Sequence, residues 1–257
     1  MSFTQIVART PCENMVNGLT TSSHLGKPDF QLALKQHAAY LDTLRQCGCQ
    51  VTCLEADSRF PDSTFVEDVA LCVPGGLVAT ISRPGAPSRL GEAELIGDTL
   101  SKHFKNIEHI NAPGTLEAGD VMMAGTHYFI GLSARTNRDG ANQLIAILQR
   151  YGLTGEIVEV PDALHLKTSV SYLENNTMIG WKEFKSMPQF AKYTFIEVDQ
   201  DELYCANSIH VNGKILMPLG NPKTKAKLEQ AGFQVLEVDS SEFRKIDGGL
   251  SCLSLRF

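Results

Sequence analysis

The sequence has no uninterrupted apolar stretch long enough to cross a bilayer, and it has no basic run. Its first residues, MSFTQIVARTP, lack the apolar core of a signal peptide. Acidic residues outnumber basic ones by 29 to 23, and the net charge of -6 offers no footprint for nucleic acid or acidic lipid. We therefore expect a soluble, cytoplasmic protein with no nucleic-acid partner and no membrane partner.

A disulfide framework and a metal-ligand spacing are also missing. The seven cysteines are an odd number without framework spacing, which favours a reducing compartment. Cys47-Gly48-Cys49, followed by Cys53, could suggest a metal site, but no matching histidine or second cysteine pair follows. We expect no metal and no cofactor.

What the sequence does contain is a repeated two-strand unit. In each copy a polar residue precedes an apolar run, a turn, a second apolar run and usually a helix. The leading residues are spaced by 52, 48, 39 and 45 positions, near the fifty that mark arrays of supersecondary units. They are Asp68, Asp120, Thr168, Asn207 and Cys252. The last copy stops after one strand, and we predict that the N-terminal IVART supplies its second.

These units predict an α/β fold of five repeats that closes into a ring resembling a propeller. Closure removes the free edges that an open sheet would expose. The 43% hydrophobic content suffices for one large domain or two smaller ones, and the repeat favours a single domain over residues 1–257. A helix is predicted over residues 29–46, with Asp29 as its N-cap, and a strand over residues 50–54.

Polar side chains occupy equivalent positions at the start of every repeat. Equivalent strand starts in a ring converge at one end of its axis, so these groups would share a single cleft. Taken alone, an aspartate after a turn is usually a cap, and His165 between two leucines is more often a core residue. The shared phase favours a site instead. The residues are Glu67, Asp68, Glu117, Asp120, His165, Lys167, Asn207 and Cys252.

The C-terminal stretch FRKIDGGLSCLSLRF predicts a glycine corner followed by a strand. Asp247, Gly248 and Gly249 supply the flexible corner, and residues 250–257 alternate at the period of a strand. Cys252 would lie near the strand start, where a thiol can act as a nucleophile if a histidine and a charge partner are near. A small buried core residue is the alternative interpretation.

Five stretches together resemble bacterial-type dimethylarginine dimethylaminohydrolases in order and spacing, from Ile6 to Phe257. They are FPDSTFVEDVA, PGTLEAGDVM, SARTN, LHLKTS and KIDGGLSCLSLRF, and LTTSSHLGKPD near the start also matches. That family belongs to the guanidine-modifying enzymes. The resemblance implies a five-bladed α/β propeller around a central active-site channel. It also implies hydrolysis of a small-molecule substrate, an Nω-methylated arginine, to citrulline and an amine by a covalent cysteine mechanism without metal.

By motif, the resemblance implies that Cys252 is the nucleophile, His165 the general acid and base, and Glu117 the carboxylate that holds guanidinium and imidazole. The substrate-binding residues that it implies are Asp62, Glu67 and Asp68 for the guanidinium and amino end, Arg89 and Arg135 for the α-carboxylate, and the carbonyls of Leu19 and Ile246 for the α-ammonium. The loop over residues 18–27 resembles a lid, one residue longer than in close relatives.

Other activities stay open at this point. Arginine deiminase uses the same chemistry, but its chains usually carry an inserted helical region that is absent here. Amidinotransfer would need an acceptor amine, and agmatine, which lacks an α-carboxylate, would make Arg89 and Arg135 superfluous as a clamp. An inactive amino-acid-binding protein is a further alternative. Covalent trapping of Cys252 by a substrate-like alkylator would distinguish the enzyme from it. A homodimer and the preference among methylated arginines are also left open.

Overall fold

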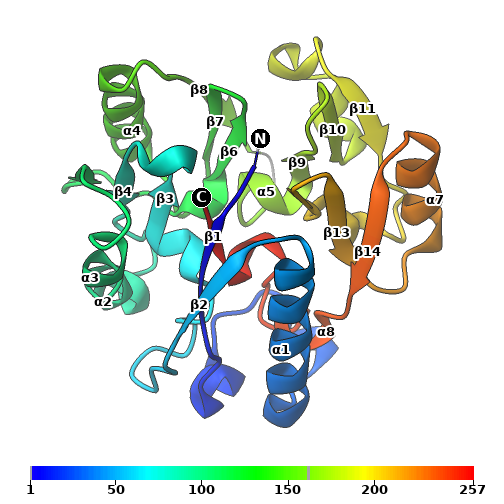
Figure 1. Ribbon diagram of the computed structural model, residues 1–257, viewed down its shortest axis with the longest axis horizontal. Coiled ribbons are helices and arrows are strands. Elements are labelled where there is room, and N and C mark those ends of the chain that lie inside the picture. The colour runs from blue at the N-terminus through cyan, green and yellow to red at the C-terminus, as the bar shows by residue number, and fades with distance from the viewer. Residues whose placement is uncertain (1, 161–162) are drawn as a thin grey trace.

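Five three-stranded sheets surround a common centre in the computed structural model, which describes residues 2–160 and 163–257 (Figure 1). In each sheet the first strand is antiparallel to the middle strand, and the third is parallel to it. The first strands lie nearest the centre. The predicted α/β fold of five repeated units is therefore confirmed.

The sheets share one strand order, and their bounds follow the predicted repeats. The first strands are β15 (Leu255–Arg256), β3 (Ala70–Cys72), β6 (Val121–Ala124), β9 (Val170–Tyr172) and β12 (Ile209–Val211). The middle strands are β1 (Gln5–Arg9), β4 (Ala79–Ile81), β7 (His127–Leu132), β10 (Thr177–Gly180) and β13 (Lys214–Pro218). The third strands are β2 (Gln50–Leu54), β5 (Ile107–His109), β8 (Thr154–Glu159), β11 (Thr194–Glu197) and β14 (Gln234–Val238).

Helices connect each middle strand to the parallel third strand, as a parallel connection requires. They are α1 (Phe30–Gln46), α2 (Leu90–Glu94) with α3 (Gly97–Leu100), α4 (Arg138–Arg150), α6 (Lys182–Lys185) and α7 (Pro222–Gln230). The Asp29 side chain accepts a hydrogen bond from Leu32 N–H, so the predicted helix and its N-cap are confirmed. No helix in the described ranges has the length and apolar character needed to span a membrane.

A short helical turn precedes the first strand of every sheet, and the polar residues that open the repeats lie in these turns or directly beside them. They are η3 (Val66–Val69), η6 (Ala118–Asp120), α5 (Leu166–Ser169), η8 (Leu203–Ala206) and η9 (Ser251–Leu253). The remaining short helices are η1 (Glu13–Asn17), η2 (Ser23–Leu25), η4 (Pro74–Gly76), η5 (Pro87–Arg89), η7 (Pro188–Phe190) and α8 (Ser241–Arg244).

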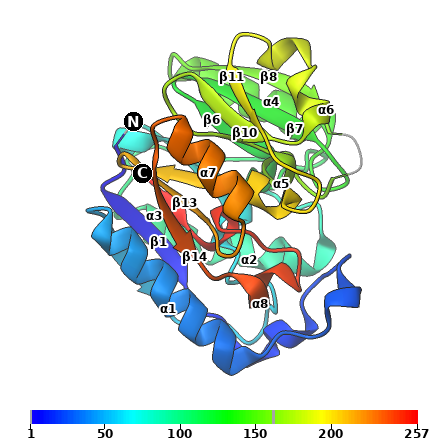
Figure 2. The same ribbon diagram turned by 90° about the vertical axis from the view of Figure 1, so that its right-hand side faces the viewer.

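The two ends of the chain complete one sheet. β15 pairs antiparallel with β1, with Ile6 opposite Arg256, and the N–H of Thr4 donates to the carbonyl of Phe257 over 2.9 Å. The prediction that the N-terminal strand supplies the missing second strand of the last repeat is confirmed. Figure 2 shows β1 running beside α1 at one edge of the molecule.

The C-terminal strand is shorter than predicted, and Cys252 precedes it. The N–H of Cys252 donates to the carbonyl of Gly249, which makes the turn η9. Residues 250–257 are buried except for Arg256, which is half-buried. The alternation of apolar and polar residues therefore does not mark one buried and one exposed face of a strand, and the strand prediction was too long. From α1, the Tyr40 hydroxyl donates to the Leu250 carbonyl over 2.9 Å and anchors the turn.

The predicted glycine corner is also different in kind. Neither Gly248 nor Gly249 has a positive φ, and the left-handed residue is Asp247, with φ of 58°. The glycines are required for close packing instead. A Cβ on Gly248 would lie 2.3 Å from the Phe65 ring, and one on Gly249 would lie 2.4 Å from Asn207 Oδ1.

Candidate active site

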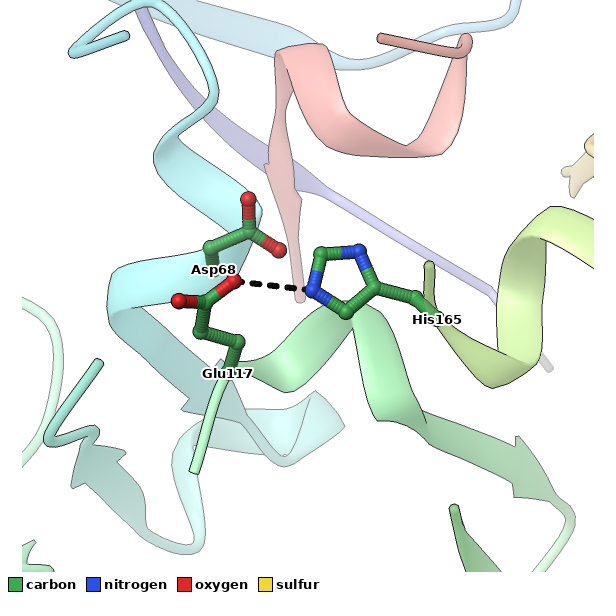
Figure 3. Close-up of side chains that lie close together, drawn as sticks. All are labelled: Asp68, Glu117 and His165. Atoms are coloured by element: carbon green, nitrogen blue, oxygen red, sulfur yellow. Dashed lines mark hydrogen bonds and ion pairs between the residues drawn. The ribbon is translucent and has the colours of Figure 1, made fainter. Parts of the chain in front are cut away.

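Three buried polar side chains from three different repeats meet at the centre of the ring (Figure 3). Asp68 lies on η3, Glu117 directly precedes η6, and His165 directly precedes α5. One ligand atom from each lies within 4.8 Å of those of the other two. The shared phase of the repeats therefore does bring these residues together.

Glu117 has no exposed surface, and both oxygens of its carboxylate have hydrogen-bond partners. Oε2 lies 2.8 Å from Nε2 of His165, while Oε1 accepts from the Ala86 N–H over 3.1 Å and from Nη1 of Arg135 over 3.3 Å. Burial raises the pKa of Glu117, but the hydrogen bond and charge of His165, with Arg89 and Arg135, outweigh it and lower the pKa to about 2. Glu117 is therefore a carboxylate at neutral pH.

His165 is buried among carboxylates. Burial lowers its pKa, but Asp68, Asp120 and Glu117 together outweigh burial and raise the pKa to about 9. The imidazole is therefore protonated at neutral pH. Figure 3 shows Nε2 facing Glu117, which leaves Nδ1 on the other side of the ring as the nitrogen available for proton transfer.

Asp120 contacts the backbone next to His165 and Glu117, a role that the sequence analysis did not predict. Its Oδ1 accepts from the N–H of Leu166, which follows His165, over 2.9 Å. Its Oδ2 accepts from the Thr136 hydroxyl over 2.7 Å, and that hydroxyl accepts from the N–H of Glu117 over 3.1 Å. Asp120 thus holds the backbone on both sides of the His165–Glu117 pair. Its place at the start of a repeat was the available signal.

Cys252 presents a buried thiol to the same centre. The Gly249 N–H donates to its Sγ over 3.4 Å, and the neighbouring N–H of Ser251 donates to Asn207 Oδ1 over 2.9 Å. Burial, followed by the charges of Asp68 and Glu67, raises the pKa of the thiol to about 12. Cys252 is therefore a neutral thiol at neutral pH.

One cavity collects most of the residues that the sequence singled out. Cys252, His165 and Asp68 all line it. The other lining residues are Leu19, Asp62, Phe65, Arg89, Arg135, Leu164, Ile246, Asp247 and Gly248. Of the ten site residues expected from the sequence, Glu117 and Glu67 do not line this cavity.

Glu67 faces a second cavity. Its Oε1 lies 2.7 Å from Nζ of Lys167 and 2.6 Å from Nη2 of Arg256, and all three residues line a cavity that also holds Phe3 and Ser208. Burial raises the pKa of Glu67, but Lys167 and Arg256 outweigh it and lower the pKa. Glu67 therefore acts on Cys252 through its charge.

The two arginines of the cavity differ in how far they are engaged. Buried Arg89 donates from Nη1 to Asp68 over 2.6 Å, from Nη2 to Glu92 over 2.8 Å, and also to the carbonyls of Asp62 and Phe65. Arg135 is partly exposed, and its ion pair with Glu117 is longer, at 3.3 Å. Arg135 is the freer of the two cations.

The triad of Asp68, Glu117 and His165 also offers ligand atoms at a spacing that could hold a metal ion. In this structure the carboxylates of the triad are paired with protein cations, Asp68 with Arg89 and Glu117 with His165. The same acceptors suit a planar organic cation, because a guanidinium donates in parallel to carboxylates.

A five-sheet ring with a thiol, an imidazole and carboxylates at its centre defines the class of guanidine-modifying enzymes, and the arginine deiminase family model matches residues 65–214. The chain belongs to the N(G),N(G)-dimethylarginine dimethylaminohydrolase family. It is 52% identical to the Pseudomonas aeruginosa enzyme of that name over 99% of this chain and 100% of that one. The predicted family is confirmed.

Solved structures agree with this assignment. The Pseudomonas aeruginosa enzyme, as a cysteine-to-serine mutant complexed with citrulline, matches with a TM-score of 0.97 and 51% identity over the whole of both chains. A histidine-to-glycine variant of a dimethylarginine dimethylaminohydrolase, as an adduct with S-methyl-L-thiocitrulline, matches with a TM-score of 0.96 and 51% identity. That match covers 99% of this chain and 100% of the other.

Proposed function

We propose that this chain hydrolyses asymmetric dimethylarginine and monomethylarginine to citrulline and dimethylamine or methylamine. The observation that carries the proposal is the buried Cys252 thiol in one cavity with His165, whose imidazole is paired with Glu117 over 2.8 Å. The names of the relatives and the complex with citrulline support the same reaction.

The substrate is a cation held by carboxylates. Its guanidinium keeps its proton at neutral pH, and Asp68 and Glu117 accept its N–H bonds, each worth about 1.5–3 kcal/mol. Arg135, as the freer cation, binds the α-carboxylate, with Arg89 behind it. The carbonyls of Leu19 and Ile246 accept from the α-ammonium, with Asp62 nearby.

In the first step Cys252 attacks the guanidinium carbon. The substrate cation favours ionisation of the thiol, whose proton passes to solvent, and a C–S bond forms. His165 donates its proton to the methylated nitrogen, and the C–N bond breaks. The products of this step are a cationic thiouronium on Cys252, the free amine and neutral His165.

In the second step neutral His165 takes a proton from water, and the hydroxide adds to the thiouronium carbon. The C–S bond of this adduct then breaks, the carbonyl of citrulline forms, and the hydroxyl proton returns to the thiolate. His165 is again protonated and Cys252 is again a thiol, as at the start.

A turnover assay on asymmetric dimethylarginine, monomethylarginine, arginine and agmatine tests the proposal. We expect citrulline and the matching amine from the two methylated substrates. Cys252→Ser should keep normal melting and form no citrulline, because a hydroxyl is far harder to deprotonate than a thiol. Undiminished turnover by this variant would contradict the mechanism.

The second candidate function is arginine deimination, which the matching arginine deiminase family model favours. It would use the same cysteine, histidine and carboxylate, with ammonia as the leaving group. Ammonia from arginine at a higher kcat/KM than methylamine from monomethylarginine would select this function.

We also propose that the protein acts in the cytoplasm as one domain over residues 1–257. The cysteines in the described ranges are all free, Cys252 among them, which suits a reducing compartment. The pairing of β1 with β15 supports a single domain, because any division of the chain would split that sheet. A homodimer stays a prediction that light scattering would test.

A further inference from the structure

Asp247 adopts a backbone conformation that is uncommon for residues other than glycine. Its φ is 58°, in the left-handed region that favours glycine, although glycines occupy the next two positions. Such strain persists where surrounding structure fixes it, and it clusters at functional sites. Here it lies between Ile246 and the turn that carries Cys252, in the wall of the cavity.

The Asp247 carboxylate holds the loop over residues 18–27. Its Oδ2 accepts from the N–H of Thr21 and from the Thr21 hydroxyl, the latter over 2.9 Å. The Thr20 hydroxyl donates to the carbonyl of Lys245 over 2.9 Å. At the start of the loop, the N–H of Leu19 donates to Asp62 Oδ1 over 3.0 Å. Leu19 thus lies between two carboxylate anchors.

These anchors lie next to two residues that line the cavity. Leu19 and Ile246 come from opposite ends of the sequence and line one cavity. Within the described part of the chain, neither carbonyl accepts a protein hydrogen bond. Asp247 ties the segment of Ile246 to the loop of Leu19 through two hydrogen bonds, and the Thr20 hydroxyl adds a third.

We propose that Asp247 is a positioning residue that fixes the separation of the Leu19 and Ile246 carbonyls, and so makes this enzyme select substrates with an α-ammonium group. The inference rests on the proposed function, because it assumes a substrate whose ammonium meets these carbonyls. Asp247 acts through the loop and not on the reacting carbon.

The test is Asp247→Gly, which keeps the left-handed conformation and removes the carboxylate. For asymmetric dimethylarginine we expect kcat/KM to fall about tenfold or more, mainly because KM rises. This is the effect of losing one charge-assisted hydrogen bond between the α-ammonium of the substrate and a displaced carbonyl. For the analogue without the α-amino group, methylated 5-guanidinopentanoate, we expect no change. An equal loss for both substrates, or no loss for either, would overturn the proposal.

Two further variants guard against a folding defect. Asp247→Asn keeps an acceptor, and asparagine tolerates the left-handed region, so this variant should retain much of the selectivity that Asp247→Gly loses. Thr21→Val removes the hydroxyl bond but keeps the N–H bond, so it should cause a smaller loss confined to the α-amino substrate. Asn175→Gly is the matched control, since Asn175 is an exposed left-handed residue with φ of 50° far along the chain, and no change is expected.

A measurement without substrate separates this inference from the proposed function. In Asp247→Gly, amide hydrogen exchange of a peptide covering residues 18–27 should be faster than in the wild type, and unchanged in Asn175→Gly. If the wild type hydrolyses no methylated arginine, the proposed function fails, while the exchange data still report whether Asp247 holds the loop. Unchanged exchange in Asp247→Gly would overturn the inference whatever the substrate.

Discussion

At the scale of single residues, the site keeps its protons in an unusual arrangement. The pKa of His165 is raised to about 9 and that of Cys252 to about 12, so at pH 7 the pair is imidazolium and thiol. A standing thiolate would face the charges of Asp68 and Glu67 in a buried position. The bound substrate cation supplies the opposite charge, so we expect the thiol of Cys252 to ionise when the substrate binds.

This arrangement predicts selective alkylation of Cys252. At pH 7 a cationic amidine alkylator should inactivate the enzyme much faster than a neutral amide alkylator of similar size and reactivity. The gap should narrow as pH rises toward the thiol pKa of about 12. Equal rates at pH 7, or a complete thiolate absorbance in the free enzyme, would indicate a standing ion pair with His165 instead.

His165 also predicts a pH dependence of stability. Its folded pKa of about 9 exceeds the ordinary 6.5, so its contribution is complete below pH 6.5 and is lost as pH rises through 9. The difference in free energy of unfolding between wild type and His165→Asn should therefore become smaller as pH rises through 9, by roughly 3 kcal/mol at most. Urea unfolding at pH 6 and pH 9.5 measures it. A difference that does not change with pH would contradict the charged imidazole.

At the scale of elements, short turns and not strands carry the chemistry. Each turn ends within a few residues of a first strand, so one arrangement is repeated around the ring, and three of the repeats bring Asp68, Glu117 and His165 together. The short helix η5 adds a cross-link, because Arg89 at its end bonds Asp68 on η3 and Glu92 on α2. Arg89 therefore holds elements together as well as facing the cavity.

We predict that substitution of Arg89 affects mainly stability, whereas substitution of Arg135 affects mainly substrate binding. Arg89→Met should lower the free energy of unfolding by about 3–5 kcal/mol, because it leaves Asp68 and Glu92 buried without their cation. Arg135→Met should change stability less and raise KM for a substrate with an α-carboxylate. Thermal melting and steady-state kinetics of both variants make the comparison, and similar melting temperatures would contradict the distinction.

The sequence predicted elements better than it predicted directions of side chains. Period and spacing are local properties, so the repeats, the helix after Asp29 and the pairing of IVART with the C-terminus followed from them. Glu67 and Asp68 are adjacent in sequence, yet they line different cavities, because successive side chains in a 3₁₀ turn point about 120° apart. The engagement of Arg89 and the left-handed Asp247 depend on contacts with distant segments, which no local pattern reports.

At the scale of the whole molecule, the single tryptophan gives a test of the proposed single domain. Trp181 lies just after β10, in a different sheet from β1. In urea its fluorescence and the far-UV circular dichroism should change with one midpoint. Ile6 is a fully buried residue of β1, and Ile6→Ala should lower both midpoints together. Two midpoints, or a shift in only one signal, would indicate separate domains.

The pairing of β1 with β15 has a consequence for how the protein folds. β1 precedes every other strand in sequence and β15 follows them all, so this pair joins the two segments that lie furthest apart along the chain. Contacts between segments so far apart are slow to form, because a long loop must close first, so the other four sheets can form earlier. The turn with Cys252 directly precedes β15, and we therefore expect the thiol to reach its place in the cavity in the same late step.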